Sequence, residues 1–172
     1  MTLLHAIFGL LSGRYDHERF WRIRDKLVSG RCGLMRYYYH WRYQQTLNRF
    51  NAFIPLSASF ESRPVLPHGI SGIHISHGAR LGRNCVIFQQ VTIGSNALPG
   101  SRLRGSPAIG DDCYIGCGAA IIGNVRIGNR VRIGANCVVV EDIPDNSTVV
   151  MQKPRVIANS EPNDNRFIPH RE

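Results

Sequence analysis

Aliphatic side chains recur every six residues over much of this 172-residue chain. Within each of two runs the spacing never slips, and a small or β-branched residue stands four positions after most of the aliphatics. The aliphatic row is Ile75, Leu81, Ile87, Ile93, Ile109, Ile115, Ile121, Ile127, Ile133 and Val139; the small row is Ala79, Cys85, Val91, Cys113, Ala119, Val125, Val131 and Cys137. Helices have a period of about 3.6 and strands of about 2. A hexapeptide period is typical of a parallel β-helix, whose stacked coils share one core.

The composition agrees with this fold class. The 17 glycines suit a chain that turns a corner every few residues, because glycine accepts the positive φ that corners often need. Five cysteines are present without a CxxC pair, and three of them occupy the small row, so we expect reduced thiols in the core. No stretch is long enough to span a bilayer, and the apolar opening from Met1 to Leu11 lacks a basic leader. We therefore expect a cytoplasmic protein.

Residues 1–55 differ in kind from the repeat. They hold nine Lys or Arg against three Asp or Glu, which places about +6 of the formal charge of +9 in the first third of the chain. A helix is predicted from Asp16, as its N-cap, to Gly30, with Phe20 and Leu27 on its apolar face. A second helix is predicted from about residue 34 to 50, with Leu34, Tyr38 and Trp41 on one face.

The segment from Arg36 to Tyr43 mixes aromatic and basic side chains. We favour packing on the end of the β-helix or on a neighbouring subunit, with the arginine stems lying along apolar surface. Contact with an anionic membrane surface or a lipid-linked substrate is the main alternative, since Trp, Tyr and Arg suit the headgroup zone. A platform for nucleic acid or saccharide is a further one. We expect no nucleic acid partner, because basic charge alone is a weak signal.

The remaining chain divides at breaks in the repeat. Residues 56–157 are predicted to form the β-helix domain, after an irregular bridge over 56–72. The gap from Ile93 to Ile109 is 16 residues, so the regular coil carries an inserted loop at 95–107. Such loops on a rigid scaffold are where function tends to sit. The polar segment 158–172 is predicted to be an extended tail.

Three histidines precede the loop: His68 in the bridge, and His74 and His77 on the first coils. Three histidines within ten residues could ligate zinc. However, no carboxylate or thiol falls at a matching place, so we expect no metal. By their phase in the repeat, His74 and His77 point outward.

Two segments make a more specific resemblance. Residues 73–94, with Gln-Gln-Val-Thr-Ile-Gly at 89–94, and residues 107–128, with Ile-Gly-Asn-Val-Arg-Ile-Gly at 122–128, resemble the serine acetyltransferases. That family belongs to the left-handed β-helix acyltransferases, and the resemblance covers about residues 54–157. It implies a left-handed β-helix, acetyl-CoA as co-substrate, and a homotrimer with active sites between subunits.

The resemblance also implies roles for single residues. His68 falls on the family's catalytic histidine and would act as general base on the acceptor hydroxyl, which is a poor nucleophile until it loses its proton. The acetyl-CoA contacts fall on Gly94, Ser95, Cys117 and Ala135. Lys153 and Arg155 resemble a C-terminal turn of the family and would meet the CoA phosphates. Glu61 or a backbone carbonyl would orient His68.

The chain also departs from the family. Phe53 stands where the family has the Asp that orients the histidine, Pro67 where it has an Asp beside the histidine, and Gly105 and Ser106 where the loop has Arg and His. With these departures and its short N-terminal segment, the chain more closely resembles the short, serine-acetyltransferase-like enzymes that O-acetylate sugars in capsule or exopolysaccharide synthesis. This resemblance implies an acetyl-CoA-dependent O-acetyltransferase that acts on a sugar hydroxyl, free or lipid-linked. The alternatives are serine O-acetylation, N-acylation of an amino sugar, and a non-catalytic scaffold.

Overall fold

The computed structural model describes residues 16–158, 160–162 and 166. The apolar opening and most of the predicted tail lie outside the described residues. The helices are α2 (His17–Val28), η1 (Gly33–Met35, a 3₁₀ turn) and α3 (Arg36–Arg49). The strands are β1 (Ser59–Phe60), β2 (His74–Ile75), β3 (Arg80–Leu81), β4 (Val86–Ile87), β5 (Thr92–Gly94), β6 (Ala108–Ile109), β7 (Tyr114–Ile115), β8 (Ala120–Ile122), β9 (Arg126–Ile127), β10 (Arg132–Ile133), β11 (Val138–Val139) and β12 (Thr148–Val149).

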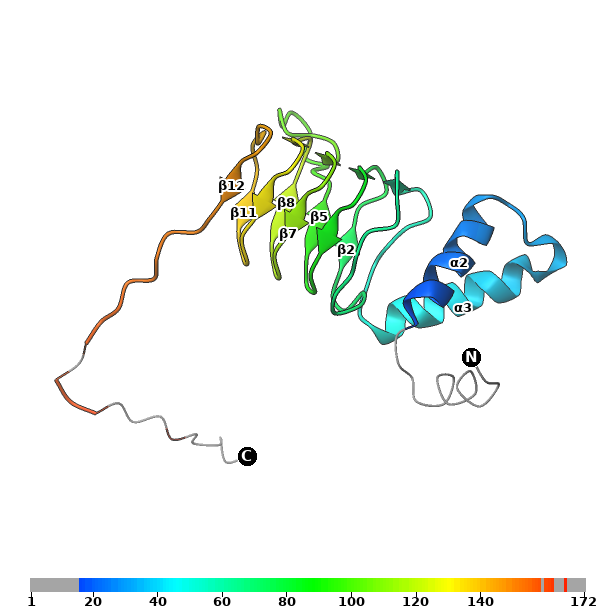
Figure 1. Ribbon diagram of the computed structural model, residues 1–172, viewed down its shortest axis with the longest axis horizontal. Helices are drawn as coiled ribbons and strands as arrows, with labels where there is room; N and C mark the ends of the chain where they lie inside the picture. The colour runs from blue at the N-terminus through cyan, green and yellow to red at the C-terminus, as the bar shows by residue number, and fades with distance from the viewer. Residues whose placement is uncertain (1–15, 159, 163–165, 167–172) are drawn as a thin grey trace.

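The short strands form three parallel sheets of four strands each, and consecutive strands go to different sheets (Figure 1). Sheet A has the order β11-β8-β5-β2, sheet B has β1-β3-β6-β9 and sheet C has β12-β10-β7-β4. Equivalent residues of the repeat pair in register, as Ile93 does with Ile121 and Ile115 with Ile133. The chain is therefore a three-sided parallel β-helix, which confirms the prediction from the six-residue period.

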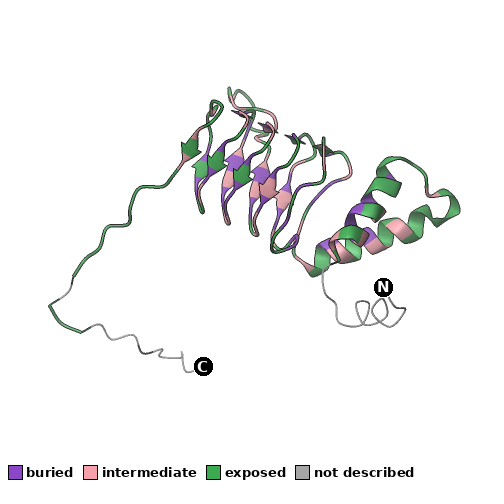
Figure 2. Cartoon of the chain, viewed as in Figure 1, coloured by how far each residue is buried: buried purple, intermediate pink, exposed green. Residues whose placement is uncertain are grey.

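The core is the column of inward side chains along the axis of the coils (Figure 2). Every residue of the aliphatic and small rows is at most 5% exposed. Cys85, Cys113 and Cys137 are buried free thiols, as predicted. Outward neighbours along the strands, such as Arg80, Arg126 and Arg132, are exposed. Burial alternates because successive side chains of a strand point to opposite faces, and only one face meets the core.

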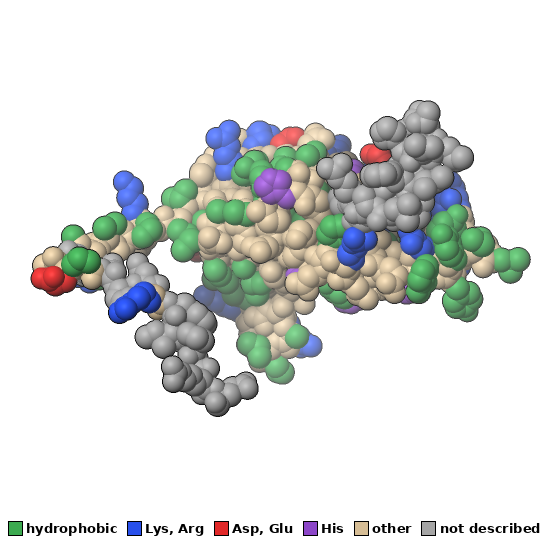
Figure 3. Space-filling model, turned by 90° about the horizontal axis from the view of Figure 1, so that it is seen from below, with side chains coloured by type: hydrophobic (Ala, Val, Ile, Leu, Met, Phe, Trp, Pro, Cys, Tyr) green, Lys and Arg blue, Asp and Glu red, His purple; other side chains and the backbone are tan. Residues whose placement is uncertain are grey.

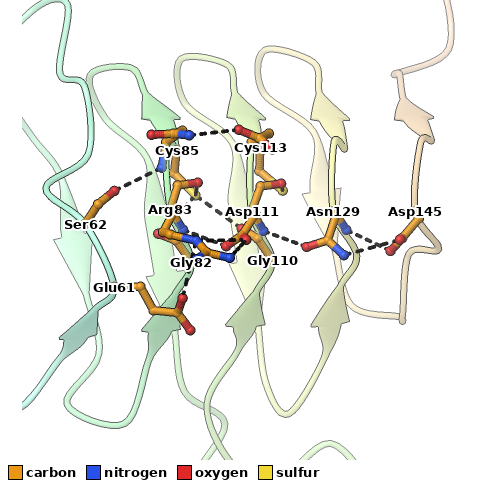
Figure 4. Close-up of polar contacts among 12 residues, drawn as sticks. Glu61, Ser62, Gly82, Arg83, Cys85, Gly110, Asp111, Cys113, Asn129 and Asp145 are labelled. Atoms are coloured by element: carbon orange, nitrogen blue, oxygen red, sulfur yellow. Dashed lines mark hydrogen bonds and ion pairs between the residues drawn. The ribbon is translucent and has the colours of Figure 1, made fainter.

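One corner of the coils carries a ladder of polar side chains (Figure 4). Asp111 Oδ1 accepts a hydrogen bond from Arg83 N at 2.7 Å, Asn129 Oδ1 from Asp111 N at 2.8 Å, and Asp145 Oδ1 from Asn129 N at 2.8 Å. Each side chain thus satisfies a backbone donor one coil away, where the chain leaves the sheet ladder. These backbone hydrogen bonds lower the pKa of Asp111 and of Asp145.

The helices form an antiparallel hairpin at the N-terminal end of the coils (Figure 1). Asp16 caps α2 by accepting from Arg19 N at 2.9 Å, as predicted. Phe20 stacks on Tyr43 of α3 with ring centroids 5.1 Å apart. Arg24, only 6% exposed, donates to the carbonyls of Leu56 and Ala58 in the bridge and so ties the hairpin to the coils. None of the described helices is long and apolar enough to cross a membrane.

The second helix buries a different face from the one the sequence singled out. Its buried side chains are Tyr43 and Leu47, which face α2 and the bridge. Leu34, Tyr38 and Trp41 are exposed, so the predicted packing of this face does not occur among the described residues. The helix therefore carries two apolar faces, and the described part of the chain covers only one of them.

Candidate active site

His68 lies in a turn of the bridge, shortly before β2 and at the edge of the coils. Its Nδ1 is 2.6 Å from Gln89 Oε1, and its ring meets Phe88 edge-on with centroids 5.5 Å apart. Because the amide oxygen can only accept, Nδ1 carries the proton and Nε2 presents a lone pair. His68 is exposed, so this nitrogen is open to a substrate. The arrangement suits a general base.

Gln89 is the partner that sequence reasoning missed. The two expected partners do not orient His68, since Glu61 lies instead 3.8 Å from the Arg83 guanidinium. Phe53, at the family's orienting-Asp position, packs edge-on against His77, with centroids 5.4 Å apart. Gln89 is the first residue of the Gln-Gln-Val-Thr-Ile-Gly motif. A polar side chain in a motif shared with the serine acetyltransferases was the one sequence signal for this partner.

Two of the predicted acetyl-CoA contacts stand below Gln89 on the same edge. Gly118 N donates to Gln89 O at 3.1 Å, and Asn136 N donates to Cys117 O at 2.8 Å. Gln89, Cys117 and Ala135 are therefore equivalent corner positions of three successive coils. The structure brings Cys117 and Ala135 into one column with the partner of His68.

The other two predicted contacts, Gly94 and Ser95, lie at the opposite end of the β5 strand. There they line a cleft of about 360 Å³, together with Phe53, His74, Ile75, Ser76, His77, Gly78, Thr92, Ile93 and Ser106. A Cβ on Gly94 would lie 2.8 Å from Ile122 Cδ1, so a side chain there would force this neighbour to move. Ser76 Oγ is buried without a hydrogen-bond partner among the described residues. The cleft thus joins apolar walls to several hydroxyls and two histidines.

His74 and His77 have separate partners. His74 Nδ1 is 3.0 Å from Gly72 O, and His77 Nδ1 is 2.9 Å from Ser57 Oγ. Within the described part of the chain, no group of three His, Cys, Asp or Glu side chains could hold a metal ion. The three histidines therefore occur as individually bonded side chains, each with its own neighbour.

Hydrogen bonds hold the base of the inserted loop, residues 95–107, against the coils. Asn96 and Gly105 exchange two backbone hydrogen bonds of 2.8 and 2.9 Å, which close the loop at its base. Gly105 has φ +133°, and a Cβ there would lie 2.9 Å from Asn124 Cβ, so this close approach requires glycine. Ser106 follows at once and faces the cleft at Gly78. A loop Arg in place of Gly105 would not fit this path.

Lys153 and Arg155 are exposed on the extended segment that follows β12 and leads away from the coils (Figure 1). The structure does not bring them to either edge of the site. Their contact with CoA phosphates stays a prediction.

Comparisons with known proteins bear on the fold and on the site. Residues 106–140 match the family model described as bacterial transferase hexapeptide (six repeats). The chain is a left-handed β-helix of hexapeptide repeats. The chain is 34% identical over 141 residues to a serine acetyltransferase of Synechococcus elongatus, covering 70% of this chain and 53% of that protein. It is 34% identical over 116 residues to one of Bacillus pumilus, covering 67% and 52%. The chain thus spans about half the length of the curated relatives it matches.

Solved structures give the same assignment of fold. Neisseria gonorrhoeae serine acetyltransferase in complex with serine aligns with a TM-score of 0.61 at 32% identity, over 78% of this chain and 53% of that one. Isoform 3 of Entamoeba histolytica serine acetyltransferase, in complex with cysteine, aligns with a TM-score of 0.61 at 30% identity, over 72% and 43%. The likeness therefore includes structures described with serine or cysteine bound.

These relatives contradict the expectation of a sugar hydroxyl as acceptor in polysaccharide synthesis. That expectation gave most weight to single replacements at Phe53, Pro67 and Ser106. The relatives named above are serine acetyltransferases, and each match covers two thirds or more of this chain. The structure also weakens the inference physically, because His68 has a hydrogen-bond partner in Gln89 of the next coil although Phe53 offers none.

Proposed function

We propose that this chain is an acyltransferase that moves the acetyl group of acetyl-CoA to the hydroxyl of L-serine. The observation that carries the proposal is the pair His68–Gln89, which leaves Nε2 of an exposed histidine free at the edge of a coil similar to those of serine acetyltransferases. The similarity to structures described with serine bound supports the choice of acceptor.

His68 would remove the proton of the serine hydroxyl as the serine oxygen bonds to the thioester carbon. Gln89 Oε1 holds the Nδ1 proton, so the imidazole presents the basic nitrogen and does not need to change tautomer. The tetrahedral oxyanion then collapses, the C–S bond breaks, and the proton on Nε2 passes to the CoA sulfur. The products are O-acetylserine and CoA, and His68 returns to its neutral form.

The residues present fit the pantetheine arm of acetyl-CoA. Gly94 and Ser95 at one edge of sheet A, and Cys117 and Ala135 at the other, keep side-chain bulk low along the coils. Ser76 Oγ, Thr92 and the two histidines of the cleft offer hydrogen bonds to polar groups of either substrate.

A homotrimer would complete the site. The four residues assigned to acetyl-CoA stand in two columns at opposite ends of the strands of sheet A. A single β-helix therefore does not gather them around one ligand. If copies pack side by side about a three-fold axis, one edge of each copy meets the other edge of its neighbour. A trimeric mass in solution is expected, and a stable, active monomer would contradict this arrangement.

The test is release of free thiol from acetyl-CoA with L-serine as acceptor, compared with L-threonine, a hexose and no acceptor. We expect L-serine to give the fastest release. His68→Ala should slow the reaction by about 10²- to 10⁴-fold, the usual size of general base catalysis. His40→Ala, which removes an exposed histidine of α3, is the matched control and should leave the rate unchanged. Unchanged turnover in His68→Ala, or no stimulation by L-serine, would refute the proposal.

A further inference from the structure

The outer face of the helical hairpin carries a continuous apolar stripe. Leu34, Tyr37, Tyr38 and Trp41 follow the spacing i, i+3, i+4, i+7, which puts them on one side of η1 and α3. Leu34 is fully exposed, Tyr37 is 88% exposed and Trp41 is 54% exposed. Met35 adds to the stripe beside Leu34. We call these five residues the hairpin patch.

The hairpin patch is apolar beyond what folding of the chain explains. The opposite side of α3 already packs through Tyr43 and Leu47, so the patch adds nothing to the core. Contiguous exposed apolar side chains of this kind mark contact sites, whereas single exposed residues do not. Tyr38 and Trp41 lie together with ring centroids 6.3 Å apart and ring planes tilted by 38°, which makes a continuous aromatic surface next to the exposed Leu34.

Cationic side chains lie beside the hairpin patch. From residue 26 to residue 60 the sequence contains no Asp or Glu and five cations, which are Lys26, Arg31, Arg36, Arg42 and Arg49. Arg31 and Arg36 are exposed at the end of the hairpin and form no salt bridge with the described residues. The Arg42 guanidinium lies 5.9 Å from the centre of the Trp41 ring. Figure 3 shows hydrophobic and Lys or Arg side chains side by side at this end of the molecule (right).

We propose that the hairpin patch binds the surface of an anionic lipid bilayer. Leu34 and Met35 protrude far enough to enter the boundary between headgroups and acyl chains, and the aromatic rings suit the headgroup level. Arg31 and Arg36 match the negative charge of the headgroups. The patch lies at the end of the hairpin that points away from the coils, so binding leaves both edges of sheet A open (Figure 1).

A second copy of the chain fits this surface less well. Two identical patches facing each other across a two-fold axis would bring arginines against arginines, with no carboxylate on the patch to neutralise them. An anionic lipid surface satisfies both the apolar and the cationic parts of the patch. This inference is independent of the proposed acetyl transfer.

The test is co-sedimentation of the full chain with vesicles of phosphatidylcholine alone and of phosphatidylcholine with phosphatidylglycerol at 3:1. We expect binding to the anionic vesicles only, with a fall as salt is raised. Trp41 is the natural reporter, because the only other tryptophan, Trp21, is 1% exposed. Its emission should shift to the blue on binding and be quenched by brominated lipid.

Two variants separate the contributions. The triple variant Leu34→Ser, Tyr37→Ser, Trp41→Ser should lower vesicle partitioning by at least 10-fold without changing acetyl transfer. Arg31→Gln with Arg36→Gln should lower it by about 5-fold for each removed cation. The matched controls are Val150→Ser with Val156→Ser, two exposed apolar residues after the coils, and Arg126→Gln with Arg132→Gln on the coils. Neither control should alter partitioning.

Several outcomes would overturn the proposal. They are absence of binding to anionic vesicles, binding that survives the triple variant, and equal losses in the control variants. Concentration-dependent self-association that the triple variant abolishes, without vesicle binding, would assign the patch to a contact between copies of the chain.

Discussion

The coils and the helical hairpin use apolar side chains in opposite ways. In the coils every aliphatic of the repeat is inside, and the outward positions are mostly polar or small. In the hairpin one apolar face of α3 is buried and the other is open to solvent. The coil geometry leaves no choice, because the six-residue phase decides which side chains meet the axis. A helix can bury either of two faces, so its contacts depend on what it meets.

An exposed apolar side chain has a different origin in each of these two regions. An exposed apolar residue on a coil, such as Val138, alternates with a buried neighbour and is a normal result of strand geometry. The exposed stripe of the hairpin has no such origin, since the helix would be equally stable with polar residues there. Apolar residues at these positions therefore point to a contact outside the described chain.

The largest expected effect tests this contrast directly. Ile121→Ala should lower the free energy of unfolding by about 2–5 kcal/mol, because Ile121 is fully buried between neighbouring coils and leaves a cavity. Leu34→Ala removes a similar volume from the hairpin patch and should change stability by no more than about 0.5 kcal/mol. Urea unfolding of both variants measures the two values. A Leu34→Ala protein as unstable as Ile121→Ala would show that the hairpin face is covered.

Much of the fold could be predicted from the sequence, because the six-residue repeat determines which side chains are buried. The phase of Ile75 to Val139 predicts each inward side chain, and the gap before Ile109 predicts the inserted loop. The face of α3 that packs could not be predicted in the same way. Tyr43 and Leu47 are buried only because Phe20 and the bridge lie against them, and that is a tertiary contact with no local signal.

The site was harder to predict than the fold. His68 could be found by resemblance, but its orientation depends on a hydrogen bond to Gln89, 21 residues later in the sequence. Comparison of single positions, such as Phe53, therefore misled the choice of acceptor. Only the stacking of the coils brings Gln89 within hydrogen-bond distance of His68.

A smaller effect is expected from an outward residue on the same coils. Gln89→Ala should leave stability nearly unchanged and lower kcat by about 3- to 10-fold with little change in KM, because a neutral hydrogen bond contributes about 0.5–1.5 kcal/mol. Gln89→Glu keeps an acceptor for the Nδ1 proton and should restore the rate. Gln90→Asn, at the next position, is the control and should behave as the parent. If Gln90→Asn lowered KM and kcat as well, the effect of Gln89→Ala would come from disturbance of the turn and not from loss of the hydrogen bond to His68.

The smallest expected effect concerns the polar ladder at the corner of the coils. Backbone hydrogen bonds and Arg83 hold the pKa of Asp111 below its usual range, so the carboxylate is favoured in the folded state. Its contribution is therefore present above the pKa of the unfolded carboxyl, about 3.9, and is lost as the pH falls through the lower folded value. Asp111→Asn should lower the Tm at pH 7 and leave a smaller difference at pH 3. Glu141→Gln, which removes an exposed carboxyl elsewhere on the coils, should show no such pH dependence. A Tm difference between Asp111→Asn and the parent that stays constant with pH would mean that the variant loses hydrogen-bond geometry at the corner. In that case the charge of Asp111 would not be what stabilises the contact from one coil to the next.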